Sequence, residues 1–168
     1  MTISPEASAP VRPTGAFMVR KLSRVIALGF GAGLAPLAPG TIGTLWAWAA
    51  WLVLRHWLDV TTLLAITAAG FVVGVWACDR CARALGVPDH GAIVWDEVIA
   101  FWLVLCLVPE GFGPQLAAFA LFRLFDIAKP PPIRHFDATL HNGFGIMFDD
   151  LVAAFYTLLV IAAWKAWL

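Results

Sequence analysis

Long apolar runs, separated by short polar or glycine- and proline-rich stretches, dominate the pattern of this 168-residue chain. A helix that crosses a bilayer needs about 20 mostly apolar residues, with a range of about 17–25. The third and fourth runs are short by this measure, so five spans is an upper count; the runs cover residues 42–57, 60–78, 93–108, 116–127 and 149–168. The pattern predicts an all-α fold, a small polytopic membrane helical bundle of about four to five apolar helices.

The N-terminal part of the chain breaks this pattern. Residues 1–24 are polar and contain several prolines, which predicts a flexible cytoplasmic tail. Residues 25–40 are apolar but contain four Gly and two Pro, a composition that disfavours a continuous helix. We expect them to form a re-entrant or interfacial loop, which a membrane tolerates where protein or water covers the backbone. Residues 25–168 are then predicted to form a single membrane-embedded domain.

Composition supports a membrane protein. Hydrophobic residues make up 61% and charged residues 13% of the chain, and its mean hydropathy is +0.84. A soluble domain of this length cannot bury so much apolar surface, so a water-soluble globule is excluded. The formal net charge is zero, which argues against nucleic acid as a partner. Three cysteines do not suggest a disulfide framework.

Basic residues set the predicted orientation. If the N-terminus is cytoplasmic and all five runs cross, the outside collects Arg55 and Lys165. The inside then collects Arg12, Arg20, Lys21, Arg24, Arg80, Arg83, Arg123, Lys129 and Arg134. This is a clear positive-inside bias, and it places the acidic residues at the ends of the runs on the cytoplasmic face as well.

Two adjacent acidic pairs stand at the starts of apolar runs. An Asp at the centre of a membrane helix costs about 2.5–3.5 kcal/mol, and less toward the ends. Asp96 and Glu97 follow an aromatic residue and precede two apolar residues and an Ala, and Asp149 and Asp150 do the same. This weak internal repeat suggests that the two pairs have the same role.

A shared cation would explain these acids. Adjacent carboxylates repel one another, and a hard divalent cation such as Mg²⁺ takes oxygen ligands from carboxylates, water and substrate phosphate. We interpret five acids as candidate metal ligands and catalytic residues: Asp96, Glu97, Asp126, Asp149 and Asp150. The alternative is that the pairs only complement helix dipoles and that Asp126 forms an intrahelical ion pair.

Candidate anion contacts fall on the same face. Thr41 is predicted to cap the first apolar helix, whose free N–H groups would attract an anion. We therefore interpret the helix start and nearby polar residues as substrate-binding candidates: Gly40, Thr41, Gly43, Thr44, His90, Lys129 and Arg134. The alternatives are glycines that serve packing, a solvated histidine and ordinary cytoplasmic basic residues.

Several blocks of sequence carry a resemblance to a known family. They are GFGAGLAPLAPGTIGT (29–44), DHGAIVWDE (89–97), and FRLFDIAKPPPIRHFD (122–137) with HNGFGIMFDD (141–150). The blocks are long, occur in order and place polar residues in an apolar context. In them the chain resembles the bacterial phosphatidylglycerophosphatase A family.

The resemblance implies a Mg²⁺-dependent lipid phosphatase, multi-pass in the bacterial inner membrane, with its active site on the cytoplasmic side. Its phospholipid substrate would be phosphatidylglycerol phosphate, and its products phosphatidylglycerol and inorganic phosphate. Residues 25–168 would form the catalytic domain. Carried over by position, the family's motif residues are Asp89, a further substrate-binding candidate, and Asp96, Glu97, Asp126, Lys129, Asp149 and Asp150.

Some features stay open at this point. The attacking group is water or a carboxylate, that of Asp96 or Asp149, and neither the number of metal ions nor the oligomeric state follows from the residues. The alternative function is a small cation-binding transporter or channel that uses intramembrane acids. Transport needs polar groups near the bilayer midplane, whereas these acids are predicted at helix ends on one side.

Overall fold

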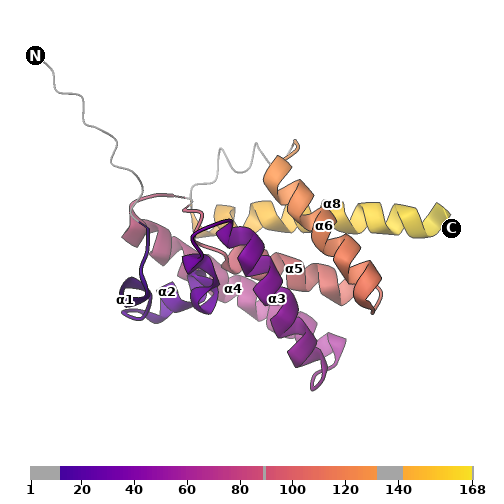
Figure 1. The fold of residues 1–168 in the computed structure, drawn as a ribbon, viewed down its shortest axis with the longest axis horizontal. Helices are drawn as coiled ribbons and strands as arrows, with labels where there is room; N and C mark the ends of the chain where they lie inside the picture. The colour runs from indigo at the N-terminus through magenta and orange to yellow at the C-terminus, as the bar shows by residue number, and fades with distance from the viewer. Residues whose placement is uncertain (1–11, 89, 132–141, 168) are drawn as a thin grey trace, which may run out of the picture.

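Regular structure in the described part of the chain is helical throughout. A computed structural model describes residues 12–88, 90–131 and 142–167. Its elements are α1 (Gly15–Met18), α2 (Leu22–Ala27), the 3₁₀ segment η1 (Gly29–Leu34), α3 (Pro39–Arg55), α4 (Val60–Leu85), α5 (Trp95–Leu107), α6 (Phe112–Ala128) and α8 (Gly143–Trp167). The five longer helices overlap the five predicted apolar runs (Figure 1). The all-α prediction is confirmed.

Helix α5 lies at the centre of the bundle, in contact with α3, α4, α6 and α8 (Figure 1). Beyond its first turn the helix is apolar on all sides, which is typical of a buried helix. The ring of Phe101 packs against Phe119 and Phe122 of α6, with centroids 5.9 and 5.6 Å apart. Nε1 of Trp102 donates to the carbonyl oxygen of Ala47 in α3 at 2.8 Å. The helix therefore contacts both α3 and α6 through neighbouring side chains.

The outer helices expose large apolar side chains. In the described residues, α4 and α8 are long and apolar enough to cross a membrane, and only 22% and 39% of their most apolar stretches are buried. A core helix of a soluble protein would be mostly buried, so the exposed apolar faces of these helices are consistent with a membrane protein. Exposed examples on α3, α4, α6 and α8 are Leu52, Val53, Val72, Leu124, Phe155 and Trp164.

The segment predicted as a loop, residues 25–40, contains the end of α2, the 3₁₀ segment η1, a non-helical stretch at residues 35–38 and the start of α3. Part of it packs on the lead-in to α5. The N–H of Val94 donates to the carbonyl oxygen of Ala27 at 2.9 Å. Gly33 lies so close to the same lead-in that a Cβ there would overlap the carbonyl oxygen of Ala92. Protein therefore covers part of this backbone, which a glycine makes possible.

The described part of the predicted tail also contacts the bundle. Nη1 of Arg24 in α2 donates to the carbonyl oxygen of Phe17 at 3.2 Å, and its guanidinium lies 3.9 Å from the centroid of that ring. Ser23 is buried, and α2 packs against α4. Packing of the bundle thus begins before residue 25.

The start of α3 differs from its prediction. The helix begins at Pro39, with Ala38 as its N-cap, so Thr41 lies in the first turn and is not the cap. Proline suits the first helical position because its φ is already helical and its missing N–H has no partner there anyway. The prediction of a Thr41 cap is wrong for this reason.

The start of α8 also lies earlier than predicted. The side-chain oxygen of Asn142 accepts from the N–H of Gly145 at 3.0 Å, as a capping residue does. The helix therefore begins at Gly143, and Asp149 and Asp150 lie in its second turn rather than at its start.

Helix α4 is capped at both ends. The carboxylate of Asp59 accepts from the N–H of Thr62 at 2.7 Å, and this bond holds the pKa of Asp59 below its usual value. At the other end Gly86 takes φ 71°, a left-handed conformation that favours glycine and ends a helix. The helix therefore runs past the predicted end at Cys78 to Leu85.

Candidate active site

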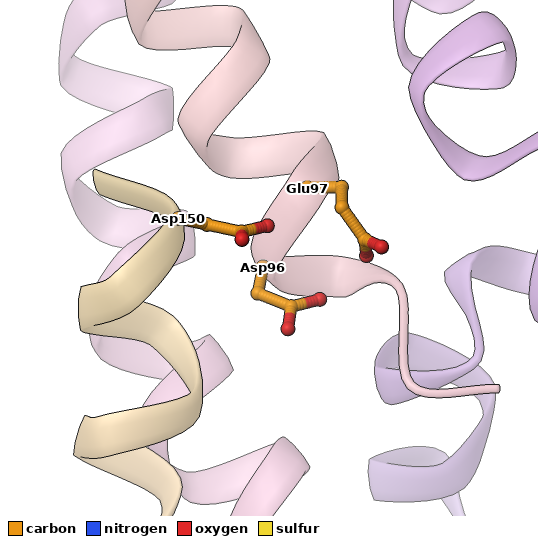
Figure 2. Close-up of side chains that lie close together, drawn as sticks. All are labelled: Asp96, Glu97 and Asp150. Carbon is orange, nitrogen blue, oxygen red and sulfur yellow. The ribbon is translucent and has the colours of Figure 1, made fainter. Parts of the chain in front are cut away.

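Three carboxylates from two helices meet at one end of the bundle. Asp96 and Glu97 lie in the first turn of α5, and Asp150 lies in the second turn of α8. Figure 2 shows Asp150 extending from α8 toward the turn that carries the other two. One oxygen of each side chain lies within 4.8 Å of the others. The structure thus brings together three of the five predicted acids, which we call the three-carboxylate group.

Each member of this group has a buried oxygen without a hydrogen-bond partner among the described residues: Oδ1 of Asp96, Oε2 of Glu97 and Oδ2 of Asp150. Asp96 and Asp150 are 7% and 4% exposed. Leaving a buried polar group unsatisfied costs about 1–3 kcal/mol, and more for a charged group, so the arrangement favours a shared cation. A set of carboxylate oxygens suits a hard divalent cation such as Mg²⁺. The residues present therefore fit a metal ion.

Helix α4 positions both acid-bearing helix starts. Nε1 of Trp95, the first residue of α5, donates to the carbonyl oxygen of Gly70 in α4 at 3.0 Å. Helix α8 approaches α4 so closely that a Cβ at Gly143 would overlap a backbone carbonyl oxygen of α4. At Gly74 a Cβ would lie 2.7 Å from side-chain atoms of Trp95 and Met147. Glycines on α4 and α8 thus allow the two helix starts to converge.

Arg123 of α6 links the three-carboxylate group to a fourth acid. Its Nη1 lies 2.5 Å from Oδ2 of Asp126 and 3.7 Å from Oε1 of Glu97. The side chains of these three residues are only 12–13% exposed. Nη1 also donates to Oγ1 of Thr44 in α3 at 3.4 Å. Asp126 thus forms the intrahelical ion pair that the sequence left open, beside the three-carboxylate group.

The fifth acid is held by a lysine. Lys129 follows α6 in a left-handed conformation with φ 40°, and its Nζ lies 2.7 Å from Oδ2 of Asp149. Oδ1 of Asp149 accepts from the N–H of Asp150 at 3.0 Å. Successive helical residues point about 100° apart. One acid of the second pair therefore joins the three-carboxylate group, and its neighbour joins an ion pair.

The predicted phosphate contacts at the start of α3 lie against α5 and α6. A Cβ at Gly40 would overlap Oε1 of Glu97, and one at Gly43 would lie 2.8 Å from the Val94 side chain just before α5. Thr44 is fully buried, and its hydroxyl donates to the carbonyl oxygen of Gly40 at 2.9 Å. In this arrangement the glycines serve close packing. Phosphate contact by these residues and by the half-buried Thr41 stays a prediction.

Three further substrate-binding candidates remain. Asp89 and Arg134 lie outside the described residues. Nδ1 of His90 accepts from the N–H of Ala92 at 3.1 Å, a contact that shapes the turn before α5. A role for His90 in substrate binding stays a prediction.

Arg123 is the site residue that the sequence interpretation did not select. Its spacing of three from Asp126 was the available signal, because residues three apart on a helix are neighbours. Its approach to Glu97 had no local signal, since the two residues belong to different helices.

Comparisons with known proteins identify the family of this chain. The family model described as "Phosphatidylglycerophosphatase A" matches residues 25–165, which include all the acids above. The chain belongs to the phosphatidylglycerophosphatase A family. The resemblance predicted from the sequence blocks is confirmed.

Two relatives named phosphatidylglycerophosphatase A show the extent of the match. The protein of Haemophilus influenzae is 46% identical over 145 residues, which cover 86% of this chain and 89% of the relative. The protein of Escherichia coli is 44% identical over 130 residues, which cover 77% of this chain and 75% of the relative. No solved structure matches the chain.

Proposed function

We propose that this protein is a phosphatidylglycerophosphatase, an enzyme that hydrolyses phosphatidylglycerol phosphate with the help of a divalent cation held by Asp96, Glu97 and Asp150. The observation that carries the proposal is the three-carboxylate group, whose buried oxygens have no hydrogen-bond partner within the described part of the chain, in a member of the phosphatidylglycerophosphatase A family. Relatives with that name cover most of the chain, which supports the same substrate.

The net reaction consumes one water molecule. The bond between phosphorus and the glycerol oxygen breaks, a bond between phosphorus and the oxygen of water forms, and the glycerol oxygen takes a proton. A Mg²⁺ ion at the site would supply Lewis-acid stabilisation of the phosphoryl oxygens. Arg123 and Lys129 add fixed positive charge beside the acids. That charge offsets part of the repulsion that a phosphate would meet among five carboxylates.

The protein is proposed to span the inner membrane several times, with this site at the cytoplasmic end. Exposed apolar side chains on the outer helices and the apolar lengths of α4 and α8 support membrane embedding. The positive-inside bias supports the orientation. Asp96 and Glu97 lie in a first helical turn, and Asp150 lies roughly 10 Å into a helix about 37 Å long. Acids near helix starts disfavour the alternative of a midplane cation transporter.

The test is phosphate release from phosphatidylglycerol phosphate by the purified protein in detergent micelles. We expect activity with Mg²⁺ and its loss on chelation. Asp96→Asn and Asp150→Asn should each lower kcat/KM by about 100-fold or more, because metal stabilisation of the transferred group is worth several kcal/mol.

Glu110→Gln is the matched control. Its carboxylate pairs with Arg55 through Oε1 at 2.6 Å and is 74% exposed. We expect near wild-type activity from this variant. The proposal is contradicted if the wild type stays active after chelation, or if both Asp→Asn variants keep wild-type activity.

A further inference from the structure

Glu97 presents its two carboxylate oxygens to different surroundings. Oε2 is buried without a hydrogen-bond partner among the described residues. Oε1 lies 3.7 Å from Nη1 of Arg123 and faces the backbone of Gly40. One oxygen is therefore engaged by the protein while the other stays available to a ligand. A group that contacts one atom of a metal-binding side chain in this way orients the side chain's other atom toward the metal.

We propose that Arg123 and Gly40 are positioning residues for Glu97: Arg123 holds Oε1, and the missing side chain of Gly40 leaves the space that Oε1 occupies. The inference rests on the proposed function, because it takes Glu97 as a metal ligand. It also gives Gly40 a role other than the phosphate contact predicted from the sequence.

The guanidinium is itself held from two further sides. Oδ2 of Asp126 lies 2.5 Å from Nη1, and Oγ1 of Thr44 accepts from the same nitrogen at 3.4 Å. Thr44 is anchored in turn by its bond to the carbonyl oxygen of Gly40. Side chains of α3 and α6 thus fix a ligand on α5. Asp126 acts in this arrangement through Arg123.

The absence of a side chain at Gly40 matters as much for the position of Glu97 as the charge of Arg123 does. A Cβ there would overlap Oε1 of Glu97 and lie 3.1 Å from Nη2 of Arg123. The atoms in the way are the ends of side chains, so an alanine would displace the carboxylate rather than the backbone. Alanine also favours a helix more than glycine does, so the change does not weaken α3.

The experiment measures Mn²⁺ binding to the purified full-length protein in detergent micelles, from the EPR signal of free Mn²⁺ and without substrate. We expect Gly40→Ala to weaken binding by about 10–100-fold, the usual effect of losing an outer partner of a metal ligand. Gly113→Ala is the matched control. Gly113 is also the second residue of its helix, and nothing lies within 4 Å of a Cβ built there.

Arg123→Lys tests the guanidinium at constant charge. A lysine keeps the positive charge, but its shorter, non-planar end does not place a nitrogen where Nη1 lies between Glu97 and Asp126. Mn²⁺ binding should therefore weaken by about 10-fold or more. Arg55→Lys is the control, because Arg55 pairs with a single acid, Glu110, and lies at the end of α3 away from Gly40. The thermal midpoint of each variant shows whether the fold is kept.

Nε of Arg123 is also buried without a partner among the described residues, so direct contact with the phosphate is the competing role for Arg123. Kinetics with the lipid substrate separate the two roles. A higher KM for the lipid with unchanged Mn²⁺ affinity in Arg123→Lys would overturn positioning in favour of phosphate contact. Unchanged Mn²⁺ affinity in Gly40→Ala would overturn the role of Gly40 and leave the proposed function intact. Absence of Mn²⁺ binding by the wild type would overturn both the positioning roles and the metal site of the proposed function.

Discussion

Adjacent residues at this site have different roles, and helix geometry separates them. Asp150 faces Asp96 and Glu97, whereas Asp149 faces Lys129. The two aspartates look equivalent in the sequence, but a rotation of about 100° per residue directs them to different partners. The partner of each acid at this site therefore depends on its own position around the helix.

Lys129→Met tests the ion pair with Asp149. The lysine is 26% and the aspartate 8% exposed, so the change leaves a nearly buried carboxylate without its ammonium partner. We expect the free energy of unfolding to fall by about 1–3 kcal/mol. Adding Asp149→Asn should recover part of this loss, because the amide carries no charge.

Unfolding of both single variants and the double variant in detergent gives the coupling energy of the pair. Additive losses, with no recovery in the double variant, would show that the pair does not stabilise the protein.

At the scale of elements, α4 is the support on which the two acid-bearing helix starts rest. Trp95 of α5 bonds to its backbone at Gly70, and Gly143 of α8 packs directly on its backbone. The distance between α5 and α8, and with it the three-carboxylate group, depends on these close approaches. Small residues act here as spacers for the site.

Gly143→Ala tests this support. A Cβ at Gly143 would overlap the carbonyl oxygen of Val75, and a backbone atom cannot move aside as a side chain can. We expect a loss of about 1–3 kcal/mol in the free energy of unfolding and a lower kcat, because Asp150 shifts with α8. Thermal unfolding and phosphate release in micelles measure the two effects.

Gly113→Ala again provides the control, since the space around that position is open. A Gly143→Ala variant with unchanged thermal midpoint and activity would show that α8 does not depend on this contact.

At the scale of the whole molecule, the two ends of the bundle differ. One end carries the acids with Arg123 and Lys129, and the other carries the ion pair of Arg55 and Glu110. Apolar side chains cover the outer helices between them. The proposed orientation in the membrane follows from the distribution of basic residues between these two ends.

Labelling in cells tests the proposed orientation. In a background without Cys78, Cys81 and Cys106, a membrane-impermeant maleimide should label Glu110→Cys in intact cells. It should label Arg83→Cys only after the membrane is permeabilised, because Arg83 is predicted on the cytoplasmic side. The side chains of the two parent residues are similarly exposed, at 74% and 73%. The reverse pattern would contradict the orientation.

The sequence determined the positions of the longer helices and singled out the acids that we propose for the site. A helix depends on hydrogen bonds between residues four apart, and an apolar run is recognised from consecutive residues alone. Both are local features of the sequence, so all five longer helices were predicted. Boundaries were less accurate where a single cap decides them: Pro39 moved the start of α3, and Asn142 moved the start of α8.

Only the tertiary structure decided which of the acids lie together. That Asp150 joins Asp96 and Glu97, and that Arg123 of α6 reaches Glu97 of α5, depends on the rotation and spacing of helices from distant parts of the chain. Gly40 illustrates the difference: the sequence suggested contact with phosphate, which stays a prediction, and only the packing showed that Gly40 makes room for a carboxylate. Local pattern carries no record of such contacts, because they form between residues that are neighbours only in space.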